Sequence, residues 1–134
     1  MSLGIQRRER EGILILDLTG RITVGEEATN LRETLREATA QGLKNVILNL
    51  RDVDYIDSTG LGALVVGFTS LRKAGGKLSL LNVSRRNIEL LVYTKLATVF
   101  EIFNDEQEAV NSYFPERAIK RFDILSFVQE QTED

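Results

Sequence analysis

The chain has 134 residues, of which 43% are hydrophobic and 28% are charged, a size and composition typical of one soluble globular domain with a single core. Its 17 basic and 20 acidic residues give a formal net charge of −3, which argues against direct binding of nucleic acid. Because cysteine and histidine are both absent, disulfides, thiol nucleophiles, Ser-His-Asp triads and zinc sites with Cys or His ligands are excluded.

The N-terminal sequence MSLGIQRRER contains no apolar signal core. No run of the chain approaches the length of about 18 apolar residues that a membrane span needs. We therefore expect a cytoplasmic protein with no membrane contact.

The first half of the chain alternates between strand and helix patterns. Residues 12–20, GILILDLTG, are an aliphatic run, and the charged residues before them predict a hairpin that turns at Glu11 and Gly12. Residues 26–42 predict a helix that ends at Gly42 and has four apolar residues at helical spacing: Ala28, Leu31, Leu35 and Ala38. Residues 45–50, NVILNL, predict a second buried strand.

The second half continues the alternation. Residues 61–76 predict a helix that ends at a Gly-Gly pair and keeps one apolar face: Leu61, Leu64, Val65, Phe68 and Leu71. A strand at 77–83 follows, then a helix with Ser84 as its N-cap and an inner face of Ile88, Leu91 and Val92. Residues 98–103 predict another strand, and residues 105–114 predict a helix capped by Asp105. This order predicts an α/β fold in which a mixed sheet of four to five strands is covered by helices.

The only proline, Pro115, separates a C-terminal tail from the rest of the chain. Apolar residues recur in the tail at helical spacing and predict an extra C-terminal helix over residues 115–134: Ile119, Phe122, Leu125 and Phe127 or Val128. Packing of this helix on the domain, docking on a partner and formation of a homodimer are all open alternatives.

The stretch YIDSTGLGALV, residues 55–65, joins the second predicted strand to the second predicted helix. Either Ser58 or Thr59 can cap this helix, and the free N–H groups of a helix N-terminus favour an anion such as phosphate. A capping cluster followed by glycines that permit a tight turn explains the same residues without any function.

Two details favour a functional role for this stretch. Gly60, Gly62 and Gly67 lie in or beside one helix, where each glycine costs about 0.5 to 1 kcal/mol relative to alanine, so close approach of another backbone or of a protein partner is expected to compensate. In addition, the helical rotation turns Val66 away from the inner face and leaves it exposed near Ser58.

Several enzymatic motifs are missing. The glycines fit neither the Walker loop, which needs a following lysine, nor the dinucleotide fingerprint G-x-G-x-x-G. Ser58 lacks the G-x-S-x-G elbow of esterases and a histidine base. Asp52, Asp54 and Asp57 alternate in what we expect to be a loop, where solvation alone explains them. The sequence therefore predicts a protein that is not an enzyme.

Residues 45–84, NVILNLRDVDYIDSTGLGALVVGFTSLRKAGGKLSLLNVS, resemble the core of the anti-sigma-factor antagonist family, the bacterial STAS domain. The shared pattern is an aliphatic strand, then D-S-[ST]-G-L-G, a helix, G-G and another strand. The resemblance extends over residues 3–114, which predicts a STAS domain there and an extension at 115–134.

The resemblance implies a phosphoprotein that regulates transcription by partner switching. The serine after the aspartate, Ser58 here, is the phosphoacceptor of a partner anti-sigma factor serine kinase. The unphosphorylated antagonist binds this kinase and releases a sigma factor, and a serine phosphatase resets the cycle. No cofactor or metal is implied. The residues expected to shape the partner-binding site are Asp57, Thr59, Gly60, Leu61, Gly62 and Val66.

Two positions depart from the family pattern. Thr23 stands where the family commonly has an acidic residue, and Lys95 stands where it often has a glycine. Two other functions remain as alternatives: a non-switching STAS module in a signalling scaffold or transporter-associated complex, and a nucleotide-binding regulator.

Overall fold

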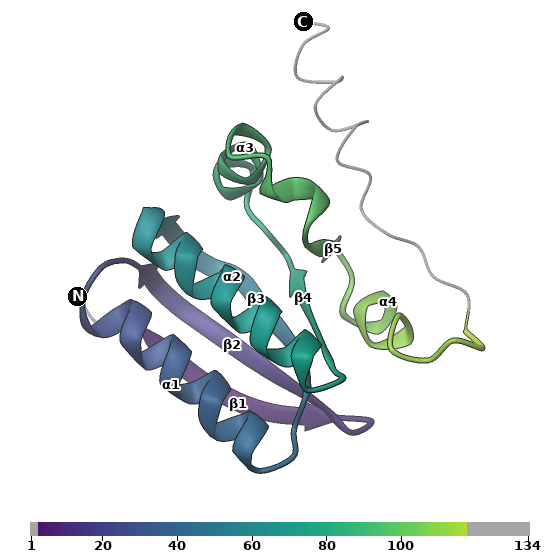
Figure 1. Ribbon diagram of the computed structural model, residues 1–134. Coiled ribbons are helices and arrows are strands. Elements are labelled where there is room, and N and C mark those ends of the chain that lie inside the picture. The colour runs from purple at the N-terminus through teal and green to yellow at the C-terminus, as the bar shows by residue number, and fades with distance from the viewer. Residues whose placement is uncertain (1–2, 118–134) are drawn as a thin grey trace, which may run out of the picture.

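The computed structural model describes residues 3–117 (Figure 1). Its strands are β1 (Gly4–Arg10), β2 (Ile13–Ile22), β3 (Asn45–Ile56), β4 (Lys77–Leu81) and β5 (Glu101–Phe103). Its helices are α1 (Glu26–Ala40), α2 (Ser58–Lys73), α3 (Arg85–Tyr93), the 3-10 helix η1 (Leu96–Thr98) and α4 (Glu106–Asn111). The expected helix in residues 115–134 lies outside the described residues for all but its first three positions.

The five strands form one mixed sheet in the order β1-β2-β3-β4-β5. The β1–β2 pair is antiparallel and its hairpin turns at Glu11 and Gly12, which have φ angles of 52° and 82°. Both values lie in the left-handed region that two-residue hairpin turns require. The remaining pairs are parallel. The mixed sheet and the hairpin turn at Glu11 and Gly12, both expected from the sequence, are confirmed.

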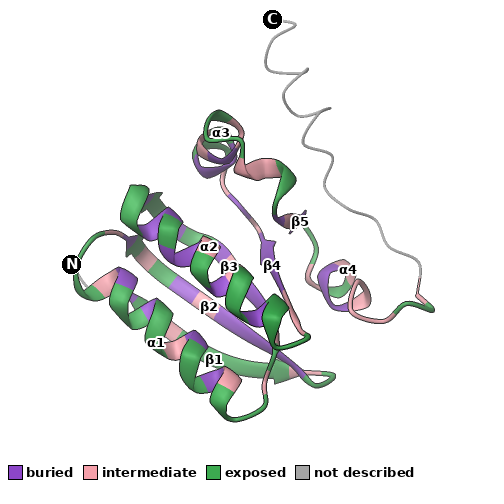
Figure 2. Cartoon of the chain, in the orientation of Figure 1, coloured by how far each residue is buried: buried purple, intermediate pink, exposed green. Residues whose placement is uncertain are grey.

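Helices cover the two faces of the sheet unequally. The larger core joins one face to α1, α2 and α3. The four apolar positions expected in α1 are all buried, and Leu31, Leu35 and Ala38 belong to this core. A smaller core on the other face packs the end of the sheet against α4 through Ile13, Ile15, Ile47 and Phe103. Figure 2 shows buried and exposed residues alternating along α1 and α2, as expected of helices with one face on the sheet.

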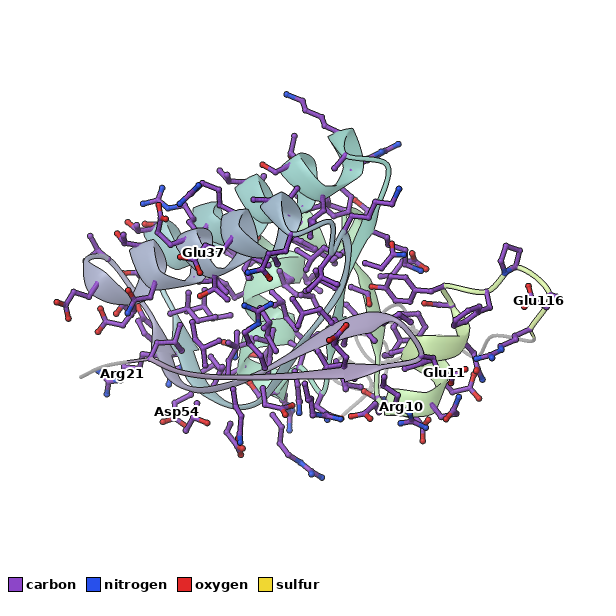
Figure 3. The ribbon with its side chains drawn as sticks, turned by 90° about the horizontal axis from the view of Figure 1, so that it is seen from below. Arg10, Glu11, Arg21, Glu37, Asp54 and Glu116 are labelled. Atoms are coloured by element: carbon purple, nitrogen blue, oxygen red, sulfur yellow. The ribbon has the colours of Figure 1, made fainter. Side chains whose placement is uncertain are left out.

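Strand β3 is six residues longer than its expected end at Leu50, so Asp52 and Asp54 lie in a strand and not in a loop. The strand continues because β2 continues beside it, with register shifts between Asp17 and Thr19 and between Gly20 and Arg21. Figure 3 shows Asp54 and Arg21 pointing outward at this end of the sheet, with Arg10 and Glu11 at the opposite end beside α4.

Other boundaries differ too. The helix expected at 61–76 is Ser58–Lys73, since Asp57 caps it three residues earlier, and the helix expected at 105–114 is Glu106–Asn111. Strand β4 ends at Leu81 and not at residue 83, because Asn82 adopts a left-handed φ of 57°. The strand expected at 98–103 is confined to Glu101–Phe103, since η1 occupies Leu96–Thr98. Within residues 3–117, no helix is long and apolar enough to cross a membrane.

Candidate functional site

Asp57 fixes the backbone at the start of α2. Its Oδ1 accepts a hydrogen bond from the Gly60 N–H at 2.8 Å, and its Oδ2 accepts one from the Val24 N–H at 2.9 Å. Asp57 is therefore the N-cap, in place of the expected Ser58 or Thr59, and it also ties the loop after β2 to the helix. With one N–H group bound at each oxygen, this carboxylate has a structural role.

Ser58 is the first residue of α2, and both Ser58 and Thr59 are exposed. Among the described residues, neither hydroxyl group has a hydrogen-bond partner in the structure. The exposed Ser58 hydroxyl thus lies at the positive end of a helix of 16 residues.

Gly60 and Leu61 are buried, and they hold the start of α2 against β2 and the core. A Cβ atom on Gly60 would come within 2.7 Å of the carbonyl carbon of Ile22, a distance that real Cβ atoms do not show. Leu61 is 6% exposed and belongs to the larger core. The close contact between Gly60 and β2 is the backbone approach that the sequence led us to expect.

Gly62 and Val66 lie on the outer side of α2. Val66 is 50% exposed, as expected. A Cβ atom on Gly62 would meet no other atom within 4 Å, so packing among the described residues does not explain a glycine there. Gly67 differs, since its Cβ would lie 2.6 Å from Cδ1 of Leu35 in α1.

A groove of about 400 Å³ lies beside Ser58, between the end of β3 and α3. Its lining includes Ser58, Tyr55, Arg86 and Tyr93. The Arg86 guanidinium lies 5.1 Å from the centre of the Tyr55 ring, within the range of a cation–π contact.

Helix α3 is held against the sheet by polar contacts next to this groove. Ser84 caps the helix as expected, accepting a hydrogen bond from the Asn87 N–H at 3.3 Å. The buried Asn87 side chain donates to the carbonyl of Val53 in β3 at 3.2 Å. The groove residues Tyr55, Arg86 and Tyr93 were not predicted from the sequence. Only the exposure of Tyr93 could have been expected, because this residue falls outside the apolar inner face of α3.

A second, larger groove of about 570 Å³ runs between α1 and α2 and has an apolar floor that includes Val66, Gly67 and Leu71. An ion-pair cluster of Arg8, Arg10, Asp17 and Glu106 lies on the other face of the sheet, beside α4. There, hydrogen bonds from Arg8 and Arg10 lower the pKa of Glu106 to about 2.

Within residues 3–117 no cluster of acidic side chains could hold a metal ion.

Comparison with known proteins gives the family and the fold. The model of the STAS domain matches residues 4–109. The anti-sigma-B factor antagonist of Bacillus subtilis is 36% identical over 102 residues, which are 76% of this chain and 92% of that protein.

Two solved structures resemble the fold. The Bacillus cell fate determinant SpoIIAA in its phosphorylated form has a TM-score of 0.64 at 21% identity, covering 81% of this chain and 98% of that one. A sulfate transporter family protein from Wolinella succinogenes has a TM-score of 0.67 at 27% identity, covering 78% of this chain and 86% of that one.

Proposed function

This chain belongs to the STAS domain family, and from that premise we propose that it is an anti-sigma factor antagonist switched by phosphorylation of Ser58. The unphosphorylated chain binds an anti-sigma factor that is a serine kinase, and this releases a sigma factor for transcription. The name of the B. subtilis relative supports the antagonist role. The phosphoacceptor, the kinase and a resetting phosphatase are parts of the proposal.

The observation that carries this proposal is the surface around Ser58. Of the five large hydrophobic side chains that are exposed among the described residues, Tyr55 and Tyr93 line the groove next to Ser58. Val24 lies in the loop that a hydrogen bond to Asp57 ties to the start of α2, and Val66 lies two turns further along α2, where it lines the second groove. Apolar groups that gather around an exposed hydroxyl are typical of a surface that a protein partner covers.

The site residues have distinct roles in this proposal. Asp57 and Gly60 hold the backbone of the turn, and Leu61 anchors α2 to the core. Thr59 and Gly62 are exposed next to Ser58 and contact the kinase together with Val66. Gly62 has no packing reason to lack a side chain, so it supports a close approach of the partner backbone to α2.

Phosphorylation switches the interface electrostatically. The Ser58 Oγ bonds to the γ-phosphorus of the kinase's ATP, the bond to the β-phosphate oxygen breaks, ADP leaves, and a base of the kinase takes the hydroxyl proton. The phosphate adds about −1.5 to −2 charges at neutral pH. The helix N-terminus tolerates this charge, whereas a closely docked surface does not, and a loss of about 2.7 kcal/mol already weakens binding a hundredfold.

The wider proposal keeps the remaining expectations from the sequence. The chain acts without enzymatic activity of its own, in the cytoplasm and without direct contact with nucleic acid or membrane. Residues 3–114 form the STAS domain, and residues 115–134 are a C-terminal extension that packs on the domain, docks on a partner or forms a homodimer.

A second candidate function is a STAS module that binds partners without a phosphorylation cycle. The fold similarity to the sulfate transporter family protein favours this alternative. The two functions differ in their partner, since only the first requires a kinase that modifies Ser58.

Incubation with the cognate kinase and ATP, followed by mass spectrometry, tests the proposal. We expect one phosphate, on Ser58, and none on the Ser58→Ala variant. Thr59 is the matched internal control, because it is also exposed and lies one residue away. Phosphate on Thr59 with Ser58 unmodified would refute the assignment, and no phosphate on either residue would favour the non-switching module.

A further inference from the structure

The groove beside Ser58 contains a guanidinium group that the proposed switch leaves without a role. Arg86, in the first turn of α3, lines the same groove as Ser58 and lies over the ring of Tyr55. It comes from an element that begins 27 positions after Ser58 in the sequence, so only the fold brings the two residues together.

Arg86 differs from its neighbour Arg85 in its charge environment. Arg85 pairs with Glu89 at 3.5 Å, one turn along the helix. Arg86 has no ion pair with any carboxylate of the described residues. The other charged groups that line the groove are Asp57, whose two oxygens are bound to backbone N–H groups, and Glu89, which Arg85 holds. Arg86 is therefore the one cation among the groove's lining residues, and it pairs with neither carboxylate there.

The backbone of α3 at Arg86 is anchored, whereas the Arg86 side chain can change its rotamer. Residues on both sides of it anchor α3, since Ser84 caps the helix and the Asn87 side chain bonds to Val53. The Arg86 side chain itself is exposed, and its one described contact is the weak stack on Tyr55. A guanidinium group on a rigid helix suits a phosphate well, because its N–H groups donate in pairs to phosphate oxygens.

We propose that Arg86 binds the phosphate group of phosphorylated Ser58 across this groove. The inference rests on the proposed function, since it concerns the phosphorylated state of the same serine. In that state Arg86 leaves the Tyr55 ring, and a salt bridge joins the start of α2 to the start of α3. The surface that a kinase would cover thus changes in two ways at once, by the added phosphate and by the movement of Arg86.

The test measures the second pKa of the phosphoserine by ³¹P NMR titration. Phosphoserine is installed at position 58 during synthesis of the full chain, so no kinase is needed. A nearby guanidinium favours the dianion, so Arg86→Gln is expected to raise this pKa by about half a unit in moderate salt. Arg72→Gln is the matched control: it removes the same charge from an exposed residue about 20 Å along α2.

An unchanged phosphoserine pKa in Arg86→Gln would overturn the proposal, as would an equal rise in Arg72→Gln. If Arg86→Gln fails to fold, the wild-type phosphoprotein decides the matter. Its Arg86 Nε–H signal must then be protected from exchange only when Ser58 is phosphorylated, and an unprotected signal refutes the contact. A failure here differs from a failure of the proposed function, which appears as absence of phosphate on Ser58 after treatment with kinase and ATP.

Discussion

Three glycines of α2 provide a test of the site because they occupy one helix in three different environments. At Gly62 the backbone is ordinary helix and a Cβ atom would meet nothing within 4 Å. Gly62→Ala therefore adds no clash and gains helix propensity, so we expect the free energy of unfolding to rise by about 0.5 to 1 kcal/mol. For a domain of this size, the melting temperature rises by about 2 to 6 °C.

Gly60 and Gly67 are the matched controls for that substitution. The Cβ of Gly60→Ala would overlap the backbone of Ile22, which cannot move without breaking the β2–β3 pairing, so we expect a loss of at least about 2 kcal/mol. The Cβ of Gly67→Ala would press on the end of the Leu35 side chain, which can rotate, so its effect should lie between the other two.

Urea unfolding of the three variants, followed by circular dichroism, measures the order. The expected order of stability is Gly62→Ala, wild type, Gly67→Ala and Gly60→Ala. A Gly62→Ala variant less stable than the wild type would contradict an unstrained helical backbone and free space at this position. A stable Gly60→Ala variant would contradict the close approach of Gly60 to β2.

Gly62→Ala also separates stability from binding. If the partner backbone approaches α2 at this glycine, the variant should bind the anti-sigma kinase at least about tenfold more weakly, a loss of about 1.4 kcal/mol, although it is more stable. Affinity equal to that of the wild type would remove Gly62 from the interface.

Three further predictions concern single residues. Asp57→Ala should lose about 1 to 2 kcal/mol of unfolding free energy by chemical denaturation, because two backbone N–H groups lose their acceptor, whereas Asp57→Asn should retain most of the cap. Lys95→Gly should raise the melting temperature, with a gain of about 0.5 to 1 kcal/mol, since Lys95 has a left-handed φ of 65°; no gain would mean that the lysine side chain compensates. Arg8 and Arg10 lower the folded-state pKa of Glu106 from 4.5 to about 2, so its stabilising contribution is complete above pH 4.5 and is lost as the pH falls toward 2. Urea unfolding at several pH values should show a smaller loss over this range in Glu106→Gln, and an identical loss would refute the pairing.

Local patterns in the sequence were sufficient to predict most elements. The helical spacing of Ala28, Leu31, Leu35 and Ala38 matches the buried face of α1, and the caps at Ser84 and Asp105 are confirmed. These features depend on residues within one or two turns of each other. The glycine expected at position 95 in the family also has a physical reason, since Lys95 adopts the left-handed conformation that glycine favours.

Features that depend on distant residues could not be predicted. Three adjacent residues, Asp57, Ser58 and Thr59, are all good caps, and the choice of Asp57 depends partly on the Val24 N–H, 33 positions earlier. The extension of β3 buries every third residue, Leu50, Val53 and Ile56, because register shifts interrupt the two-residue period of a regular strand.

The groove next to Ser58 shows the same limitation. Tyr55 and Arg86 lie 31 positions apart, and their contact requires both the extended β3 and the anchored α3. Of the residues that line this groove, only Asp57 and Ser58 were candidates in the sequence.

The central claim is that the phosphorylation state of Ser58 sets the affinity for an anti-sigma kinase. Isothermal titration calorimetry of the chain with its cognate kinase, in unphosphorylated and phosphorylated forms, tests it most directly. We predict tight binding of the unphosphorylated chain and of Ser58→Ala, and binding at least about a hundredfold weaker for the phosphorylated chain. Equal affinities for the phosphorylated and unphosphorylated forms would contradict the claim.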